Sequence, residues 1–278
     1  MDGETQVYAI LGQPVHHSRS PQIQNAAFRA AGMNAVFVAL EVPASRLKQA
    51  LEGLHAAHVP GLNLTAPHKE AAFSLVRERT AEAEEARAVN TLKWEPEGWR
   101  GHATDGVGFL QWVASAGVEV KGRRVLVLGA GGAARAIVPK LLTVHPESVR
   151  LVSRSADHAK ALAQLAGNPS RSVPITSAGM EDQSQGGPEW DLLVRAISAE
   201  PVSPQEGLWW RGHAPGAVVL DLNYGARSAE ARAQSKAMGL RYEDGGALLI
   251  HQGANSFEFW TGKKAPLDAM REALNAAG

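Results

Sequence analysis

The chain has 278 residues, 45% of them hydrophobic and 20% charged, and its 28 basic residues balance its 28 acidic residues. This balance gives no bulk electrostatic reason to expect nucleic acid or an anionic membrane as a partner, and the absence of cysteine excludes disulfides and thiolate chemistry. The N-terminal residues lack the charged and apolar regions of a signal peptide, and no apolar run approaches the roughly 18 residues that span a bilayer. We therefore expect a cytoplasmic protein that acts on small molecules, and at about 150 residues per domain the length predicts two domains.

The first third of the sequence alternates short apolar runs with helical patterns. We expect strands at residues 7–12, 35–42 and 62–64, and helices at 21–31, 44–58, after Pro67 and at 79–88. Two further runs, 89–94 and 99–104, flank a Glu-Pro-Glu-Gly turn and are typical of a hairpin. A helix then begins at Asp105, a residue type that favours helix N-termini.

The rest of the chain continues the alternation. Residues 122–142 predict a buried strand, a glycine turn and a helix, and further strands are expected at 148–155, near 173–176, at 191–198 and at 217–223. A long helix at 246–261 and another after Pro266 end the chain. Strands alternating with helices are the signature of βαβ units, so we predict an α/β fold with mostly parallel sheets.

The strongest local motif lies in the glycine turn. It matches G-x-G-x-x-G/A directly after a strand and at the start of a helix, with the residues Gly129, Ala130, Gly131, Gly132, Ala133 and Ala134. Glycines permit the tight turn and the close approach of a pyrophosphate, and the helix N-terminus supplies N–H donors. We therefore expect a Rossmann-type dinucleotide site rather than a merely structural turn.

The end of the next strand indicates which dinucleotide binds. NAD sites usually carry Asp or Glu there to hold the ribose 2′-hydroxyl, whereas this chain has Ser153, Arg154 and Ser155. An arginine can form paired hydrogen bonds with a 2′-phosphate, and hydroxyls add further donors. The sequence therefore favours NADP over NAD. The alternative interpretation is that Arg154 is an ordinary solvated arginine at the end of a strand.

Polar residues also follow the predicted strands of the first third and recur near the C-terminus. In open α/β sheets ligands bind outside the carboxyl ends of the strands. Hydroxyls, amides, one lysine and one aspartate suit a small polyhydroxylated ligand, including one that carries a carboxylate, although each residue alone could serve a turn or a cap. The set is Ser18, Ser20, Asn63, Thr65, Lys69, Asn90, Thr104, Asp105 and Gln252.

Lys69 occupies a position in its helix where a positively charged residue is unfavourable. It falls in the first turn of the helix after Pro67, where the positive end of the helix dipole disfavours a cation by about 0.3–1 kcal/mol. Residues that break a local rule are expected at functional sites. A lysine there, aimed by a carboxylate, can give a proton to a developing alkoxide or take it back.

The order and spacing of these residues resemble the shikimate dehydrogenase family over nearly the full chain. The matching elements are S-x-S-P at 18–21, N-x-T-x-P-h-K at 63–69, A-V-N-T at 88–91, T-D-x-x-G at 104–108, the glycine turn, and Q-x-x-x-S-F-E-x-W at 252–260. Together these elements are far more specific than any one of them alone.

The resemblance implies NADP(H)-dependent, reversible reduction of 3-dehydroshikimate to shikimate, a step toward the aromatic amino acids. It implies a substrate-binding and catalytic domain at 1–104 plus 246–278, a Rossmann domain at 105–245, and an active-site cleft between them, in a monomer or homodimer. Lys69 and Asp105 would form the catalytic pair. They would also bind substrate together with Ser18, Ser20, Thr65, Asn90, Tyr224 and Gln252, and Ile197 and Gly245 would join the glycine turn at the cofactor.

The cofactor half matches the family less closely than the substrate half. Residues 195–200 read R-A-I-S-A-E where the family has N-A-T-S-x-G beside the nicotinamide, and a buried Arg195 must find a partner because an unpaired buried charge is very costly. Ala103 replaces a usual Asn, and Ala247-Leu248 replaces a usual Gly-Met.

These departures keep alternatives open. One is a paralogue that acts on quinate or an aminoshikimate-like compound, and another is a non-catalytic ligand-binding regulator. Retention of both Lys69 and Asp105 argues against the regulator, since a binder needs no such pair.

Other chemistries find no support in the sequence. The histidines form no H-E-x-x-H or similar ligand set, and we expect His55 and His58 on a solvated helix face, so no metal site is predicted. Trp209-Trp210 indicates local packing, and no G-x-S-x-G elbow of a serine hydrolase is present.

Overall fold

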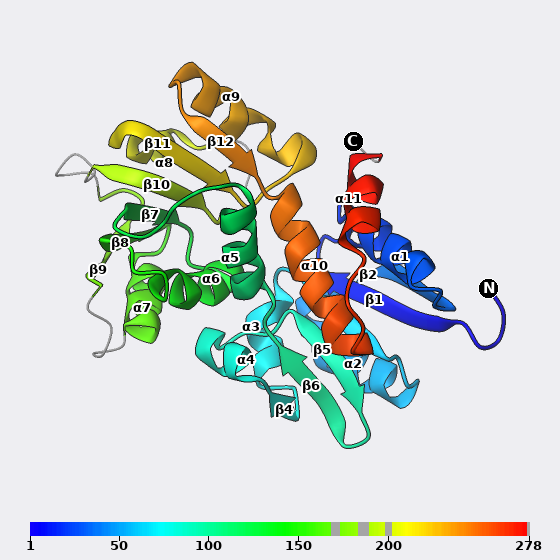
Figure 1. The fold of residues 1–278 in the computed structure, drawn as a ribbon. Helices are drawn as coiled ribbons and strands as arrows, with labels where there is room; N and C mark the ends of the chain where they lie inside the picture. Colours follow the sequence, from blue (N-terminus) through cyan, green and yellow to red (C-terminus); the bar gives the residue numbers. More distant parts are fainter. Residues whose placement is uncertain (168–172, 183–188, 198–201, 277–278) are drawn as a thin grey trace. The chain divides into compact units, whose positions relative to one another are not determined.

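The computed structural model describes residues 1–167, 173–182, 189–197 and 202–276. The chain divides into two compact units, unit 1 (Met1–Phe109 with Leu248–Gly278) and unit 2 (Leu110–Ala247). It passes from one unit to the other inside helix α5 (Asp105–Ser115) and returns inside helix α10 (Gly246–Thr261) (Figure 1). The expected fold class, two α/β domains with mostly parallel sheets, is confirmed.

Unit 1 is built on a mixed sheet. Its elements before α5 are β1 (Gln6–Gly12), α1 (Ser20–Ala30), β2 (Ala35–Glu41), η1 (Ala44–Arg46), α2 (Leu47–Ala56), β3 (Gly61–Leu64), α3 (His68–Phe73), β4 (Glu78–Arg79), α4 (Ala81–Ala86), β5 (Thr91–Glu95) and β6 (Gly98–His102). Helices α10 and α11 (Leu267–Asn275) complete it from the C-terminus.

In the described residues this sheet has the strand order β2-β1-β3-β5-β6-β4. Strand β1 runs parallel to β2 and to β3, with Leu11 opposite Leu64, whereas β3, β5 and β6 form an antiparallel meander. The last five residues of β1 are buried, as expected of a central strand covered on both faces. The carboxyl ends of β1 and β3 therefore lie side by side.

Unit 2 carries a parallel sheet. Its elements are β7 (Arg124–Leu128), α6 (Gly132–Leu142), β8 (Ser148–Ser153), α7 (Ala156–Ala166), β9 (Ile175–Gly179), β10 (Trp190–Arg195), α8 (Pro204–Trp210), β11 (His213–Asp221), η2 (Gly225–Ser228), α9 (Ala229–Ala237) and β12 (Arg241–Asp244).

The described strands of unit 2 are ordered β12-β11-β10-β7-β8-β9, and all neighbouring pairs are parallel. The order reverses between β7 and β10, which makes their carboxyl ends the topological switch point where ligands of such sheets bind. Right-handed crossovers put α6 and α7 on one face and α8 and α9 on the other (Figure 1). Trp209 and Trp210 are buried in the core of the sheet, which confirms their expected packing role.

The structure departs from the sequence expectations in short or polar segments. Strand β4 pairs with β6 where a helix start was expected, and β12, α8 and α9 were not predicted. The helix expected at 44–58 ends at Ala56, because His58 adopts a positive φ of 56°. His55 and His58 were expected on a solvated helix face. His55 lies on α2 but its ring stacks on Trp94, and His58, beyond the end of α2, contacts the same ring. Over the described residues, no helix is long and apolar enough to cross a membrane.

Candidate active site

The first part of the candidate site is formed where β1 and β3 end. The Thr65 N–H donates to the Leu11 carbonyl at 2.9 Å, and the Gln13 N–H donates to the Ala66 carbonyl at 3.0 Å. Gly12 has no side chain because a Cβ there would lie 2.3 Å from Thr65 Cγ2. The close fit positions Thr65 beside the β1–α1 loop, which carries Ser18 and leads to the buried Ser20 at the start of α1.

Lys69 and Asp105 form a close ion pair. Lys69 is the second residue of α3, as expected, and its Nζ lies 2.6 Å from Oδ2 of Asp105, the first residue of α5. The Val89 N–H donates to the Lys69 carbonyl at 2.9 Å and anchors this turn. The two side chains keep 17% and 10% of their surface exposed, so the pair is largely desolvated but still accessible.

Asn90 connects the ion pair to three segments of the chain. Its Nδ2 donates to Asp105 Oδ1 at 2.9 Å, to Thr104 Oγ1 at 2.9 Å and, more weakly, to Gln252 Oε1 at 3.4 Å. Its Oδ1 accepts from the Thr104 N–H at 2.8 Å. An amide has only two N–H hydrogens, so the long contact to Gln252 is the one that can yield to a ligand.

Ser256 supports this network, a role that was not predicted although Ser256 is the serine of the Q-x-x-x-S-F-E-x-W element. It is fully buried, accepts a hydrogen bond from Asn63 Nδ2 at 3.0 Å and lies 2.8 Å from the Thr91 hydroxyl. Its hydroxyl also donates to the carbonyl of Gln252, one helical turn earlier, at 3.0 Å. The available signal was the spacing, since residues four apart on a helix share a face.

The glycine turn of unit 2 has the geometry of a pyrophosphate site. Gly129 adopts a φ of +115°, and a Cβ there would lie 2.5 Å from the Ala196 carbonyl. Gly131 has open space around its Cβ position, and α6 begins at Gly132 with no side chain capping its N–H groups. Ala130 and Ala133 occupy the same turn. The exposed N–H groups at this helix N-terminus therefore fit an anionic cofactor.

The strand that follows ends in residues that fit a 2′-phosphate. Arg154 is exposed and has no ion pair within the described part of the chain. Ser153 ends β8, and Ser155 caps α7 by accepting from the His158 N–H at 3.3 Å. Of the three, Arg154 therefore keeps the most capacity to bind a ligand.

Arg195 is buried and forms ion pairs, as expected from the high free-energy cost of an unpaired buried charge. It is 1% exposed, its Nε lies 2.5 Å from Glu206 Oε1, and its Nη1 lies 3.4 Å from Asp221 Oδ2. Burial raises the pKa of Asp221 against the opposing effect of Arg195, and the Tyr242 hydroxyl donates to the same carboxylate at 2.9 Å. We name these residues, Arg195, Glu206 and Asp221, the buried arginine cluster.

The other residues expected near the cofactor lie close to this cluster. The Ile197 carbonyl accepts from Asn223 Nδ2 at 2.8 Å. Gly245 packs so closely on Leu222 that a Cβ would lie 2.2 Å from its carbonyl oxygen, which gives that glycine a packing reason of its own. Tyr224 is half-buried and directly precedes η2 in unit 2. Residues 198–200 of the R-A-I-S-A-E stretch lie outside the described residues.

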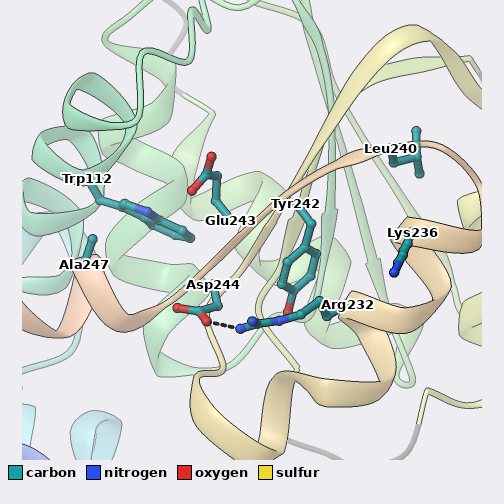
Figure 2. A pocket seen from close by; sticks show the side chains of 8 residues that line it. All are labelled: Trp112, Arg232, Lys236, Leu240, Tyr242, Glu243, Asp244 and Ala247. Carbon is teal, nitrogen blue, oxygen red and sulfur yellow. Dashed lines mark hydrogen bonds and ion pairs between the residues drawn. The ribbon is translucent and has the colours of Figure 1, made fainter. Parts of the chain in front are cut away.

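A pocket of about 450 Å³ opens beside β12 and α9 in unit 2. Figure 2 shows the Arg232 guanidinium between the Tyr242 ring and the Asp244 carboxylate, with which it forms an ion pair. Two of the charged residues that line this pocket, Arg232 and Asp244, are thus already paired with each other. In the described chain no three His, Asp or Glu side chains gather in a metal-binding arrangement.

Comparison with known families accounts for most of the chain. Residues 10–92 match the model of the shikimate dehydrogenase substrate binding domain, 113–205 that of shikimate / quinate 5-dehydrogenase, and 248–274 that of the shikimate 5′-dehydrogenase C-terminal domain. A shikimate dehydrogenase (NADP(+)) of Symbiobacterium thermophilum is 37% identical over 99% of this chain and 95% of its own length. The chain belongs to the shikimate dehydrogenase family.

Solved structures of this family share the fold. The shikimate dehydrogenase of Aquifex aeolicus superposes with a TM-score of 0.84 at 32% identity, covering 99% of both chains. The Thermus thermophilus shikimate 5-dehydrogenase, solved with NADP(H) and shikimate, gives a TM-score of 0.81 at 30% identity, covering 98% of this chain and 100% of its own. The family resemblance expected from the motifs is confirmed.

Proposed function

We propose that this protein is an NADP-dependent shikimate dehydrogenase, which reversibly reduces 3-dehydroshikimate to shikimate. The observation that carries the proposal is the Lys69–Asp105 pair, 2.6 Å apart and still partly accessible. Family membership supplies the substrate class, since relatives that bear this activity are 35–38% identical over nearly their full length.

Lys69 handles the proton in this proposal. NADPH, when bound, would supply the hydride that reduces the ketone carbon, and the Lys69 ammonium would give its proton to the oxygen that gains negative charge. Asp105 holds that ammonium in place through Oδ2, while Asn90 holds Oδ1 of the same carboxylate. In the reverse direction, Lys69 receives the proton from the substrate hydroxyl.

The remaining polar residues hold the substrate. Ser18, Ser20 and Thr65 lie at the joined ends of β1 and β3 and supply hydroxyls for the carboxylate and ring hydroxyls. Asn90 and Gln252 share the long 3.4 Å contact, which a substrate hydroxyl can replace with shorter bonds. Tyr224 is a further substrate-binding residue that the family resemblance implies.

Unit 2 holds the cofactor. The N–H groups at the glycine turn, residues 129–133, bind the pyrophosphate, and Arg154, with Ser153 and Ser155, binds the 2′-phosphate. Ile197 and Gly245 contribute to the nicotinamide end. The domains thus proposed are a substrate-binding and catalytic domain, 1–104 with 246–278, and an NADP-binding domain, 105–245.

The test is a set of initial rates, followed by NADPH absorbance, with shikimate or quinate crossed with NADP or NAD. The proposal expects turnover with shikimate and NADP and little with the other pairs. Faster turnover with quinate would identify a quinate paralogue. No turnover with any pair, while shikimate still raises the Tm, would indicate a ligand-binding regulator.

The proposal includes a cytoplasmic location and a monomeric or homodimeric state. The substrate and cofactor are small soluble molecules, which suits an enzyme dissolved in the cytoplasm. Cell fractionation and light scattering of the purified protein test the two parts separately.

A further inference from the structure

A second cavity lies in unit 1 at the end of the sheet away from Lys69. It has a volume of about 430 Å³ and lies at the start of β1 and β3, where Tyr8 and Pro60 line it. The candidate site lies instead where these strands end. A volume between roughly 300 and 1,000 Å³ is typical of small-molecule sites. We call this cavity the aromatic pocket.

Two indole rings form a fixed wall of the aromatic pocket. The Trp94 Nε1–H donates to the His55 carbonyl at 3.0 Å, and the Trp260 Nε1–H donates to the Leu92 carbonyl at 2.9 Å. Gly61 leaves room for Trp260, because a Cβ there would lie 2.6 Å from the ring. Both rings are therefore held in place before any ligand arrives, which lowers the entropic cost of stacking on them.

Tyr8 brings an unused donor to the same cavity. Its side chain is 3% exposed, and its ring packs against Phe28 at 4.8 Å and Trp260 at 5.3 Å. Its hydroxyl forms no hydrogen bond within the part of the chain that the structure describes. Burial raises the pKa of Tyr8, so the hydroxyl stays protonated and can donate. The hydroxyl is therefore available to donate a hydrogen bond to an acceptor on a ligand.

The charge lining the aromatic pocket is positive. Lys93 and Lys263 both line it, and neither forms an ion pair with a described carboxylate. No acidic side chain is among the lining residues. An anion placed there would meet two ammonium groups and the Tyr8 hydroxyl.

We propose that the aromatic pocket is a second ligand site, separate from Lys69 and Asp105, for a small aromatic carboxylate. The ring of the ligand packs against Trp94 and Trp260, and its carboxylate accepts hydrogen bonds from Lys93, Lys263 and Tyr8. Flat π-faces favour an aromatic ring over a saturated one of equal charge, which separates this site from one that merely attracts anions.

The test is calorimetric titration of the intact protein with benzoate, and with cyclohexanecarboxylate as a saturated ring of the same charge. Benzoate is expected to bind more tightly than cyclohexanecarboxylate. Lys263→Ala and Tyr8→Phe are each expected to weaken benzoate binding about tenfold, the effect of losing about 1.4 kcal/mol. Since the Tyr8 hydroxyl bonds to no described group, Tyr8→Phe removes no internal hydrogen bond of the fold.

Two controls locate the binding. Lys264→Ala changes the neighbouring exposed lysine, which does not line the pocket, and is expected to leave benzoate binding unchanged. Lys69→Ala is expected to leave it unchanged as well. The proposal is overturned if benzoate fails to bind, if both ring types bind equally, or if Lys69→Ala abolishes binding while Lys263→Ala does not. None of these readouts depends on enzymatic turnover.

Discussion

Each of the two units buries charged groups near strand ends, but these groups differ in how much of their side-chain surface stays exposed. In unit 1, Lys69 and Asp105 keep 17% and 10% of their side-chain surface exposed. In unit 2, the members of the buried arginine cluster keep only 1%, 3% and 0%. The first pair stays partly accessible to solvent, whereas the second is closed inside the protein.

The hydrogen bonds of the two groups also distinguish an ion pair that is available to a ligand from a purely structural one. The carboxylates around Arg195 accept their hydrogen bonds from other protein groups. Asp221, for example, also accepts from Tyr242 and Asn223. Among the described residues, the Lys69 ammonium bonds to Asp105 alone, although it carries three N–H donors. A charged cluster near a predicted cofactor site is therefore not by itself evidence of chemistry.

The largest expected effect comes from Lys69→Ala. Loss of the proton donor is expected to lower kcat about 10²–10⁴-fold, with a much smaller change in KM for shikimate. Initial-rate kinetics measure both constants. Lys48→Ala, at an exposed lysine paired with Glu52, is the matched control and should leave both constants unchanged. An effect of Lys69→Ala confined to KM would remove Lys69 from the catalytic role.

Arg195→Met tests the structural role of the buried arginine cluster in unit 2. It leaves Glu206 and Asp221 buried without their cation, so the free energy of unfolding is expected to fall by about 3–5 kcal/mol. Urea unfolding measures it. A second change, Glu206→Gln, is expected to restore part of the loss.

The control for Arg195 is Arg124→Met in the same unit. Arg124 also pairs with two carboxylates, Glu189 at 2.5 Å and Asp191 at 2.8 Å, but it is 29% exposed. Its hydrogen bonds lower the pKa of Asp191 to about 2, yet exposed pairs contribute at most about 1 kcal/mol. Equal losses from the two variants would mean that burial does not distinguish the clusters.

Arg154→Ala examines an exposed cation that pairs with no described residue. It is expected to raise KM for NADP about tenfold, the loss of one charge-assisted contact worth about 1.4 kcal/mol, and to leave KM for NAD unchanged. Initial rates with both cofactors measure the ratio. A parallel rise for both cofactors would assign Arg154 to some part of the cofactor other than the 2′-phosphate.

The smallest effect concerns His68, the neighbour of Lys69. It is fully buried, with Nε2 2.8 Å from the Val42 carbonyl, and burial lowers its pKa below the ordinary 6.5. Because the unfolded chain protonates more readily, its contribution to stability is present above about pH 6.5 and is lost as the pH falls through the lower folded pKa. His68→Gln is expected to flatten the fall of Tm between pH 7 and pH 5. An unchanged slope would assign the acid sensitivity to other groups.

Much of the fold could be predicted because its signals are local. Helix α10 has the bounds that the sequence predicted, since a long apolar pattern ends at Gly262 with a positive φ. Strand β12 was missed because its four residues, Arg-Tyr-Glu-Asp, lie at a polar sheet edge and carry no apolar run. Strand β4 has only two residues and depends on its pairing with β6.

The candidate site likewise contains residues that could be predicted from the sequence and residues that could not. Lys69, Asn90, Asp105 and Gln252 were predicted from their motifs, and the structure joins them by hydrogen bonds. Ser256 was not predicted, because its role depends on Asn63 and Thr91, which are far away in sequence. The partners of Arg195 were likewise unpredictable, since Glu206 and Asp221 become neighbours only when β10, α8 and β11 pack together.

The order of the chain sets when this site can exist during synthesis. Unit 2 is complete in sequence once Ala247 has been made, whereas unit 1 also needs Leu248–Gly278. Until that last segment leaves the ribosome, Asn63 and Thr91 lack Ser256, and Asn90 lacks Gln252. The nascent protein therefore has the whole sequence of unit 2 before unit 1 can form these hydrogen bonds, and a chain released early would lack them.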